Sequence, residues 1–234
     1  RFLSRPEPGE QRAGGHRGRN IQALGEGGSG VVFLAAQSLY ERIEVQRAIK
    51  FFMYRDDIAH LSAHGTPISK DDFLAEIVNI SSINHESLVK VIDAGMHAVD
   101  ALEIPYIVTE YVGGPTLREV LEHRAAPGIL ETWQQDDGAP VLKLLLSIGE
   151  AICYLHSIGF AHCDIAPKNI FLKETESYRP VLGDLGLAKN VGRPREDVLI
   201  AGTRSYMPPE ALSSLNKNVA WEEFVALHPR WDMW

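Results

Sequence analysis

At 234 residues the chain is long enough for one large domain or for two lobes that share a cleft. Its 45% hydrophobic and 23% charged residues are ordinary for a globular protein, and no apolar run approaches the ~20 residues that span a bilayer. The net charge of −8 argues against nucleic acid as a partner, so we expect neither a nucleic-acid site nor a membrane segment in this stretch.

Residues 1–19 form a basic arm, with five arginines against two glutamates and several glycines and prolines. This composition is typical of a disordered lead-in. The first residue is Arg rather than Met, so we expect the numbering to begin inside a longer polypeptide.

The two cysteines, Cys153 and Cys163, are too few for a disulfide framework and lack the spacing of zinc ligands. Their number and placement predict a reducing, cytoplasmic setting.

A glycine cluster lies between two strand-like apolar pieces from Ile21 to Leu34. Its glycines fit the pattern G-x-G-x-x-G, in which a turn without Cβ atoms lies close over phosphates and offers them its N–H groups. A plain glycine-rich hairpin turn is the alternative, and the strand that follows argues against a dinucleotide-binding turn. The candidate cofactor contacts here are Gly25, Glu26, Gly27, Gly28, Ser29, Gly30 and, two places further on, Val32.

The next predicted strand, Val45 to Phe52, contains Lys50 within an apolar run. A lysine in such a run either faces water at the sheet edge or pairs with an anion, because an unpaired buried charge is costly. A helix is predicted to begin near Ser69, with apolar residues at positions 73, 77, 80 and 83. Glu76 lies beside that apolar stripe and is a candidate counter-ion for Lys50.

The middle of the chain predicts two further strands, His85 to Asp93 and Pro105 to Val112, and then a short helix capped by Thr116. We expect residues 123–139 to form an acidic surface loop. The clearest helix is Pro140 to Ser157, whose apolar residues predict a wide buried face: Leu142, Leu145, Leu146, Ile148, Ile152 and Leu155.

The strongest chemical pattern follows that helix. His162-Cys163-Asp164 precedes Asn169 by a few residues, and Asp184-Leu185-Gly186 comes fifteen residues after Asn169, beyond two short predicted strands. Phosphoryl transfer needs a carboxylate that orients the attacking hydroxyl and oxygen ligands for Mg²⁺ on the triphosphate. The order and separation of these residues predict such a site.

Together these motifs resemble the eukaryotic-type protein kinase family from about residue 20 to residue 234, ending in the family-like segment Gly202-Thr203 … Met207-Pro208-Pro209-Glu210. The resemblance implies an α+β bilobal fold. Residues 20–112 would form a small antiparallel sheet lobe with one helix and the hinge. Residues 113–234 would form part of a mainly helical lobe, which lacks its later helices and would expose a broad apolar face.

The resemblance also implies cofactors and roles, namely ATP and Mg²⁺ with a protein substrate that offers a Ser or Thr hydroxyl. Lys50 would hold the phosphates and pair with Glu76. Asp164 would orient the substrate hydroxyl, and Asn169 and Asp184 would bind the metal ion.

The adenine ring would lie between Val32 and Ala48 on one side and Phe171 on the other. Glu110 and Val112 would offer it backbone groups in the hinge, beside Thr109. By the same resemblance, four residues would stack as a spine that links the lobes: Ile80, Val91, His162 and Leu185.

Three departures from the family pattern qualify this reading. Cys163 replaces the Arg that usually receives an activation-loop phosphate, and residues 189–202 contain no Ser, Thr or Tyr, which predicts a kinase without phosphorylation there. Ala166 replaces the usual Lys, and Lys168 would act in its place beside Thr203. The chain stops where the long central helix would begin, at Asp232, which would anchor the catalytic loop.

A Ser/Thr protein kinase is the reading that these residues favour. A pseudokinase, which binds nucleotide or acts as a scaffold, is the main alternative, because of Cys163, Ala166 and the early end of the chain. A small-molecule phosphotransferase is the third reading, and the Pro208-Pro209-Glu210 segment speaks against it.

Overall fold

The computed structural model describes residues 22–27, 30–39, 43–52, 80–99, 102–126, 128–192, 197–200, 202–215 and 217–233. Several predictions fall outside these ranges. They concern the basic arm at 1–19, the turn residues Gly28 and Ser29, and Glu76. They also concern the helix predicted to begin near Ser69, of which only residues 80–81 are described.

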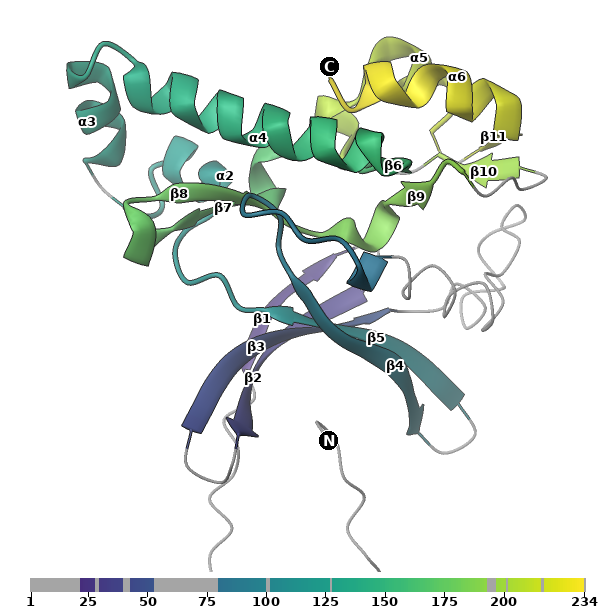
Figure 1. Cartoon of the computed structure of the whole chain (residues 1–234), viewed down its shortest axis with the longest axis horizontal. Coiled ribbons are helices and arrows are strands. Elements are labelled where there is room, and N and C mark those ends of the chain that lie inside the picture. The colour runs from purple at the N-terminus through teal and green to yellow at the C-terminus, as the bar shows by residue number, and fades with distance from the viewer. Residues whose placement is uncertain are drawn as a thin grey trace, which may run out of the picture.

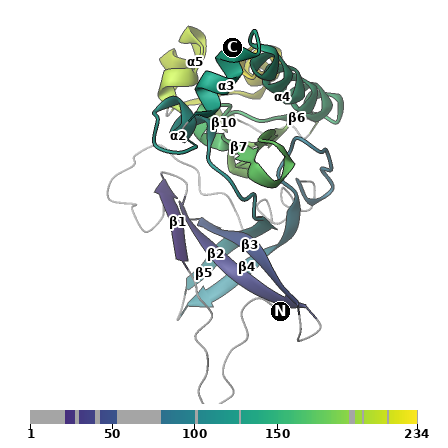
Figure 2. The same cartoon turned by 90° about the vertical axis from the view of Figure 1, so that its left-hand side faces the viewer.

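The first lobe is a five-stranded sheet in the order β1-β2-β3-β5-β4, with every neighbouring pair antiparallel (Figure 1). The strands are β1 Gln22–Gly27, β2 Gly30–Leu39, β3 Ile43–Phe52, β4 Val91–Val99 and β5 Leu102–Glu110. Figure 2 shows the sheet lying apart from the helices, as an α+β bilobal fold requires. The predicted fold class is confirmed.

One strand begins later than predicted. The segment from His85 to Lys90 is not part of β4, because it crosses to the other lobe instead. There Leu88 forms a bridge with Leu182, and the Val89 N–H donates to the Leu182 carbonyl at 2.8 Å. This segment therefore ties the sheet lobe to the helical lobe.

The second lobe holds the remaining elements in the described residues. Its α-helices are α2 Leu117–Leu121, α3 Ile129–Gln135, α4 Ala139–Ser157, α5 Pro209–Ser213 and α6 Trp221–Trp231. Its short strands are β6 Phe160–Ala161, β7 Ile170–Lys173, β8 Arg179–Leu182, β9 Lys189–Asn190, β10 Asp197–Leu199 and β11 Asn218–Ala220. Single 3₁₀ turns span Pro167–Asn169, Glu174–Glu176, Leu185–Leu187 and Arg204–Tyr206. As predicted, Thr116 caps α2, and it forms a capping box with Glu119.

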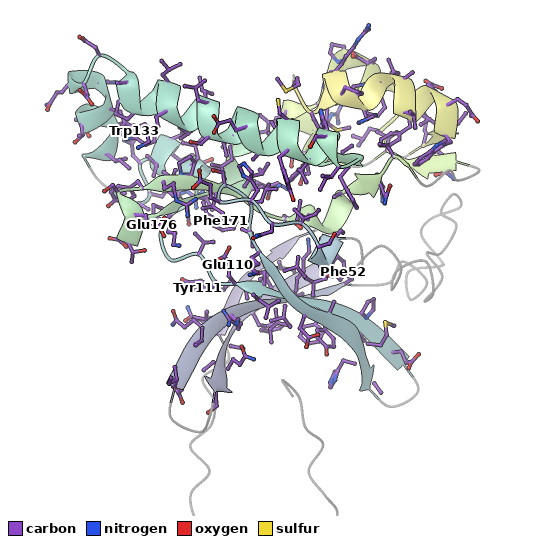
Figure 3. All side chains as sticks on the ribbon, in the orientation of Figure 1. Phe52, Glu110, Tyr111, Trp133, Phe171 and Glu176 are labelled. Carbon is purple, nitrogen blue, oxygen red and sulfur yellow. The ribbon has the colours of Figure 1, made fainter. Side chains whose placement is uncertain are left out.

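The region 123–139 is not the loop that its composition predicts, because it contains α3. Ile129 is buried, and Trp133, one helical turn further on, packs against the core of the lobe (Figure 3). The polar and acidic residues near these two positions led the composition to predict a loop. Ile129 and Trp133 nevertheless anchor α3 on the core of the lobe.

Only part of the predicted face of α4 is buried. Leu144, Ile148 and Leu155 lie in the core together with Ala151 and Ile152. By contrast, three leucines on the neighbouring stripe are exposed by 58%, 61% and 59% of their area: Leu142, Leu145 and Leu146. These three leucines form an exposed apolar stripe on α4.

The expectation of no membrane-length segment needs a correction for the same helix. α4 has 19 residues and a mean hydropathy of 1.3 in its most apolar window, which is sufficient by length and composition to cross a bilayer. The core helix of a globular domain passes the same test. In this structure, Leu144, Ile148 and Leu155 place one side of α4 in the core of the lobe.

Asp232 follows α6 as its C-cap, and the long helix predicted to begin there stays a prediction. α6 packs through Trp221 and Phe224 into a second apolar cluster, separate from the α4 core.

Candidate active site

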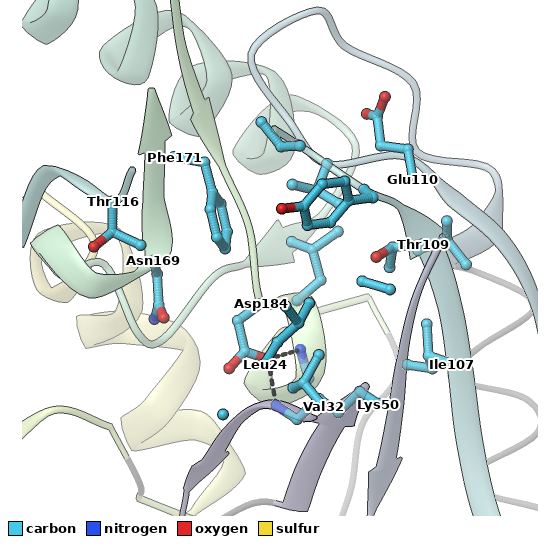
Figure 4. Close-up of a pocket in the computed structure, with 18 of the residues that line it drawn as sticks. Leu24, Val32, Lys50, Ile107, Thr109, Glu110, Thr116, Asn169, Phe171 and Asp184 are labelled. Carbon is cyan, nitrogen blue, oxygen red and sulfur yellow. Dashed lines mark hydrogen bonds and ion pairs between the residues drawn. The ribbon is translucent and has the colours of Figure 1, made fainter. Parts of the chain in front are cut away.

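A cavity of about 310 Å³ lies between the two lobes (Figure 4). The sheet lobe, the hinge after β5, and the segments around β7 and Asp184 all contribute to its walls. Its lining includes Val32, Ala48, Lys50, Thr109, Glu110, Val112, Lys168, Asn169, Phe171 and Asp184. Most of the predicted site residues that the structure describes therefore line one cavity, and its volume suits a small-molecule ligand.

The hinge end of the cavity offers backbone groups to a ligand. Val112 lines the cavity and is 7% exposed, and within the described residues neither its N–H nor its C=O forms a hydrogen bond. Buried backbone groups are almost always paired, so these two are available to a ligand. Glu110 contributes no side-chain group, because its Oε1 accepts from the Lys90 N–H at 2.9 Å and its carboxylate points away from the cavity (Figure 4).

The glycine turn joins β1 to β2 and is described only in part. Gly25 lines the cavity, and Gly27 pairs with Gly30 across the hairpin, whereas Glu26 is exposed. Gly30 has φ of 144°, and a Cβ there would collide with the backbone carbonyl of Phe51 on β3. Glycine at position 30 is thus required by sheet packing, and the phosphate contacts of this turn stay a prediction.

Lys50 projects from β3 to the opposite end of the cavity. Its Nζ lies 2.5 Å from Oδ1 of Asp184, and its side chain is 13% exposed. Asp184 has a left-handed backbone (φ 59°), and its Oδ1 also accepts from the Gly186 N–H at 3.3 Å. The predicted partner Glu76 lies outside the described residues. In the described part of the chain, Lys50 thus pairs with the predicted metal ligand.

Asp164 is 5% exposed, and both of its carboxylate oxygens are engaged. Oδ1 accepts from the Thr203 N–H at 2.7 Å and from its hydroxyl at 2.6 Å. Oδ2 accepts from Nδ2 of Asn169 at 2.9 Å and lies 3.2 Å from Nζ of Lys168. Burial by itself raises the pKa of this carboxyl, but these hydrogen bonds and the lysine charge outweigh it and lower the pKa. Asp164 is therefore an anion at neutral pH and can accept a hydrogen bond from a hydroxyl.

Asn169 and Asp184 present oxygens that fit a magnesium ion. The Asn169 amide nitrogen donates to Asp164 at its backbone carbonyl (2.8 Å) and at its carboxylate (2.9 Å). Within the described residues, Oδ1 of Asn169 and Oδ2 of Asp184 have no hydrogen-bond partner, and both residues line the cavity. The described residues contain no group of three His, Cys, Asp or Glu side chains that could hold a metal. Magnesium is commonly held by one or two protein oxygens, with phosphates and water completing its coordination.

Lys168 supplies the cation that Ala166 lacks. Ala166 is 1% exposed, so its side chain lies in the interior of the lobe. Lys168 is 41% exposed at its side chain and reaches back one turn to Asp164. The positive charge therefore lies beside the carboxylate and at the cavity wall.

His162 connects the two acidic residues of the site. It is fully buried; its Nδ1 accepts from the Asp164 N–H at 3.2 Å, and its Nε2 donates to the Gly183 carbonyl at 3.1 Å. A ring that accepts at one nitrogen and donates at the other is neutral. Ile80, Val91 and Leu185, which the family resemblance groups with His162 as a spine, are also buried, and all three lie in one core cluster.

Asp232 holds the backbone of the same loop. Its Oδ2 accepts from the His162 N–H at 2.7 Å and its Oδ1 from the Cys163 N–H at 2.8 Å. Cys163 has φ of 68°, a strained conformation for a residue with a side chain, and the paired acceptors of Asp232 stabilise it.

His156, which no sequence motif singled out, has its Nε2 2.9 Å from Oδ2 of Asp232. It is the one histidine of α4, six residues before His162, and nothing in this spacing distinguishes it from a surface histidine. The contact depends on how α4 and the end of α6 pack together, which only the folded chain reveals.

We expect the Asp232 contacts to make stability sensitive to acid. Burial alone would raise the pKa of Asp232, but the hydrogen bond from His156 and those from the loop backbone outweigh it and lower the pKa. The carboxylate therefore stabilises the fold fully above its ordinary pKa of about 4, and this contribution is lost as pH falls through the lower folded value. Asp232→Asn should reduce the free energy of unfolding at neutral pH by about 2–3 kcal/mol.

Urea unfolding of both proteins at neutral pH and at steps down to about pH 2 measures this effect. The variant should lose less stability between neutral and acid than the wild type does. An equally steep loss in both proteins would contradict the assignment.

Comparison with known proteins agrees with this geometry. The family profile described as "Protein kinase domain" matches residues 19–226. A probable serine/threonine-protein kinase of Streptomyces coelicolor is 32% identical over 191 residues, which are 80% of this chain and 25% of that protein. Serine/threonine-protein kinase PknB of Mycobacterium tuberculosis is 27% identical over 81% of this chain and 28% of its own length. Cysteine-rich receptor-like protein kinase 42 of Arabidopsis thaliana is 30% identical over 80% of this chain and 26% of its own length.

The chain thus spans about a quarter of the length of the curated relatives it matches. The family match itself extends through both lobes, from before β1 to within α6. The chain belongs to the protein kinase domain family.

Proposed function

We propose that this chain is the catalytic part of a Ser/Thr protein kinase that transfers the γ-phosphate of ATP to a protein hydroxyl. The observation that carries the proposal is the convergence of Lys50, Asn169 and Asp184 at one end of a single cavity, with Asp164 bonded to Asn169. Catalysis of phosphoryl transfer consists mainly of positioning and charge stabilisation, and these four side chains supply both.

Each residue has a defined part in this mechanism. The backbone of Val112 binds the base, and Lys50 neutralises phosphate charge. Asp164 accepts a hydrogen bond from the substrate hydroxyl and fixes its direction of attack. Asn169 and Asp184 would hold Mg²⁺, which when bound bridges the phosphates and reduces their charge. Because its pKa is lowered, Asp164 acts mainly by orienting the hydroxyl.

The preference for Ser and Thr rests on two observations. The relatives from Streptomyces and Mycobacterium carry the name serine/threonine-protein kinase. In this chain, Thr203 donates two hydrogen bonds to Asp164 at the place where an acceptor hydroxyl has to approach.

We further propose that the enzyme needs no phosphate between residues 189 and 202. That segment has no hydroxyl residue. At the position where related kinases have a phosphate-binding arginine, the half-buried Cys163 packs against the apolar cluster of α6, and its Sγ lies 3.7 Å from the Ala161 carbonyl. Position 163 therefore offers no positive charge to a phosphate on that segment.

One experiment tests the proposal: the full-length protein is incubated with labelled ATP, Mg²⁺ and a generic protein substrate, before and after phosphatase treatment. We expect label on Ser and Thr, with the same rate after the treatment. Lys50→Met should lower the rate by about 10²–10³-fold, because it removes the charge beside the phosphates. It should leave the far-UV circular dichroism spectrum unchanged. Lys90→Met, an exposed lysine outside the cavity, is the matched control.

The alternatives predict other outcomes. A pseudokinase would bind nucleotide without transferring label, and a small-molecule phosphotransferase would label a soluble metabolite but not protein. Label on Tyr alone would contradict the proposed Ser/Thr specificity, and loss of activity on phosphatase treatment would contradict independence from phosphorylation.

A further inference from the structure

The segment 189–202, which we call the activation segment, pairs with a strand that comes later in the chain. β10 (Asp197–Leu199) runs antiparallel to β11 (Asn218–Ala220), with Val198 opposite Val219. Just beyond this ladder, the Ile200 N–H donates to the Lys217 carbonyl at 3.0 Å. Figure 1 shows the two strands side by side next to α6.

The residue that ends this ladder is buried in an apolar cluster. Ile200 is 3% exposed. Its cluster joins the loop before the catalytic residues to the segment after the ladder: Ala161, Ala211, Val219, Trp221 and Phe224. Burying an isoleucine side chain contributes on the order of 1.5–3 kcal/mol, which is comparable with the effect of the charge-assisted hydrogen bonds that a phosphate forms.

Ile200 lies three residues before Thr203, and Gly202 between them approaches the catalytic loop closely. Gly202 has φ of 151°, and a Cβ there would lie 2.8 Å from the Cys163 carbonyl. Directly after it, Thr203 donates its two hydrogen bonds to Asp164. The position of Ile200 therefore helps to determine where Thr203 meets the catalytic carboxylate.

The other end of the segment is held in a similar way, independently of β11. β9 pairs with β6 through Lys189 and Asn190, and the Val191 N–H donates to the Gly159 carbonyl at 2.7 Å. Both ends of the segment are thus fixed by backbone pairing, and at the catalytic end the partner strand is β11.

We propose that β11 and the first turn of α6 act as a brace, defined as residues 217–224, which places Thr203 on Asp164 without a phosphate. Ile200 and Val219 are its positioning residues. The inference rests on the proposed kinase function, and it explains how a segment without a phosphorylation site keeps an ordered catalytic end. The ladder supplies backbone hydrogen bonds, and the cluster supplies apolar burial.

The test compares two variants of the full-length protein, each of which replaces one buried isoleucine by alanine. Ile200→Ala removes the apolar contact of the brace, and Ile129→Ala removes another buried isoleucine (7% exposed) of α3, in the separate core cluster of α4. We expect Ile200→Ala to lower kcat by about 10–100-fold with KM for ATP within about twofold, because the loss is one of positioning. Ile200→Val should restore kcat to within about threefold of the wild type. Ile129→Ala should leave kcat unchanged at temperatures where it is folded.

Deuterium exchange of the peptide 197–203 tests the brace without relying on activity. Exchange there should be faster in Ile200→Ala than in Ile129→Ala when each variant is measured the same number of degrees below its own midpoint of thermal unfolding. If Ile200→Ala does not fold, Val219→Thr, which places a hydroxyl in the same cluster at nearly constant volume, replaces it. Equal kcat and equal exchange in the two cavity variants would overturn the brace. A wild type that transfers no phosphate would overturn the kinase proposal, and the exchange result would still decide on the brace.

Discussion

Replacing Asp164 by alanine is expected to lower kcat for phosphoryl transfer by about 10³-fold while the affinity for ATP stays within about twofold of the wild type. The carboxylate is 5% exposed, is ionised, and is fixed by Thr203 and Asn169, so it defines the direction from which a hydroxyl attacks. It is not among the residues that line the nucleotide cavity, so nucleotide binding should survive its removal.

Steady-state transfer from labelled ATP gives kcat, and calorimetric titration with ATP gives the affinity. Asp136→Ala, which removes an exposed aspartate at the end of α3, is the matched control and should leave both values unchanged. Thermal unfolding of each variant shows whether the fold is destabilised when Thr203 and Asn169 lose the carboxylate that accepts their hydrogen bonds. A kcat for Asp164→Ala within tenfold of the wild type would contradict the orienting role.

Replacing Asp184 by asparagine should lower metal-dependent ATP turnover by about 10²–10³-fold. The amide keeps the shape of the side chain but loses the negative charge that a divalent cation requires, and it weakens the hold on Lys50 at 2.5 Å. Titration of activity with Mg²⁺ should show a weaker apparent affinity for the metal ion as well as a lower maximum.

Asp93→Asn on β4 provides a control, because it is an exposed aspartate that does not line the cavity. Chelation of Mg²⁺ from the wild type should reproduce the loss seen in the variant. Turnover by Asp184→Asn that equals the wild type at the same Mg²⁺ concentration would show that this side chain is not a ligand of the catalytic metal ion.

Local signals in the sequence predicted several strands, α4 and the acidic pattern, whereas the family resemblance implied the two lobes and the grouping of Lys50 with the acidic residues. Alternating apolar residues define strands, and the spacing of Asp164, Asn169 and Asp184 is short and ordered. Even so, the sequence placed Leu142, Leu145 and Leu146 in the core, because helical periodicity indicates an apolar face without showing whether a neighbour covers it.

The features that the sequence did not predict depend on long-range packing. His156 reaches Asp232 only because α4 and the end of α6 meet, 76 residues apart in the chain. The pairing of β10 with β11 likewise joins two three-residue segments that carry no recognisable strand pattern. Such short strands are stabilised by their partners and by the surrounding core, so single-sequence propensities do not reveal them.

The backbone groups of Val112, which form no hydrogen bond with the described residues, have a consequence for how this pocket can evolve. Every amino acid except proline supplies the same N–H and C=O, so most mutations at this position would leave these two groups in place for a ligand. Selective inhibitors would therefore have to exploit nearby side chains that line the cavity, such as the small Thr109.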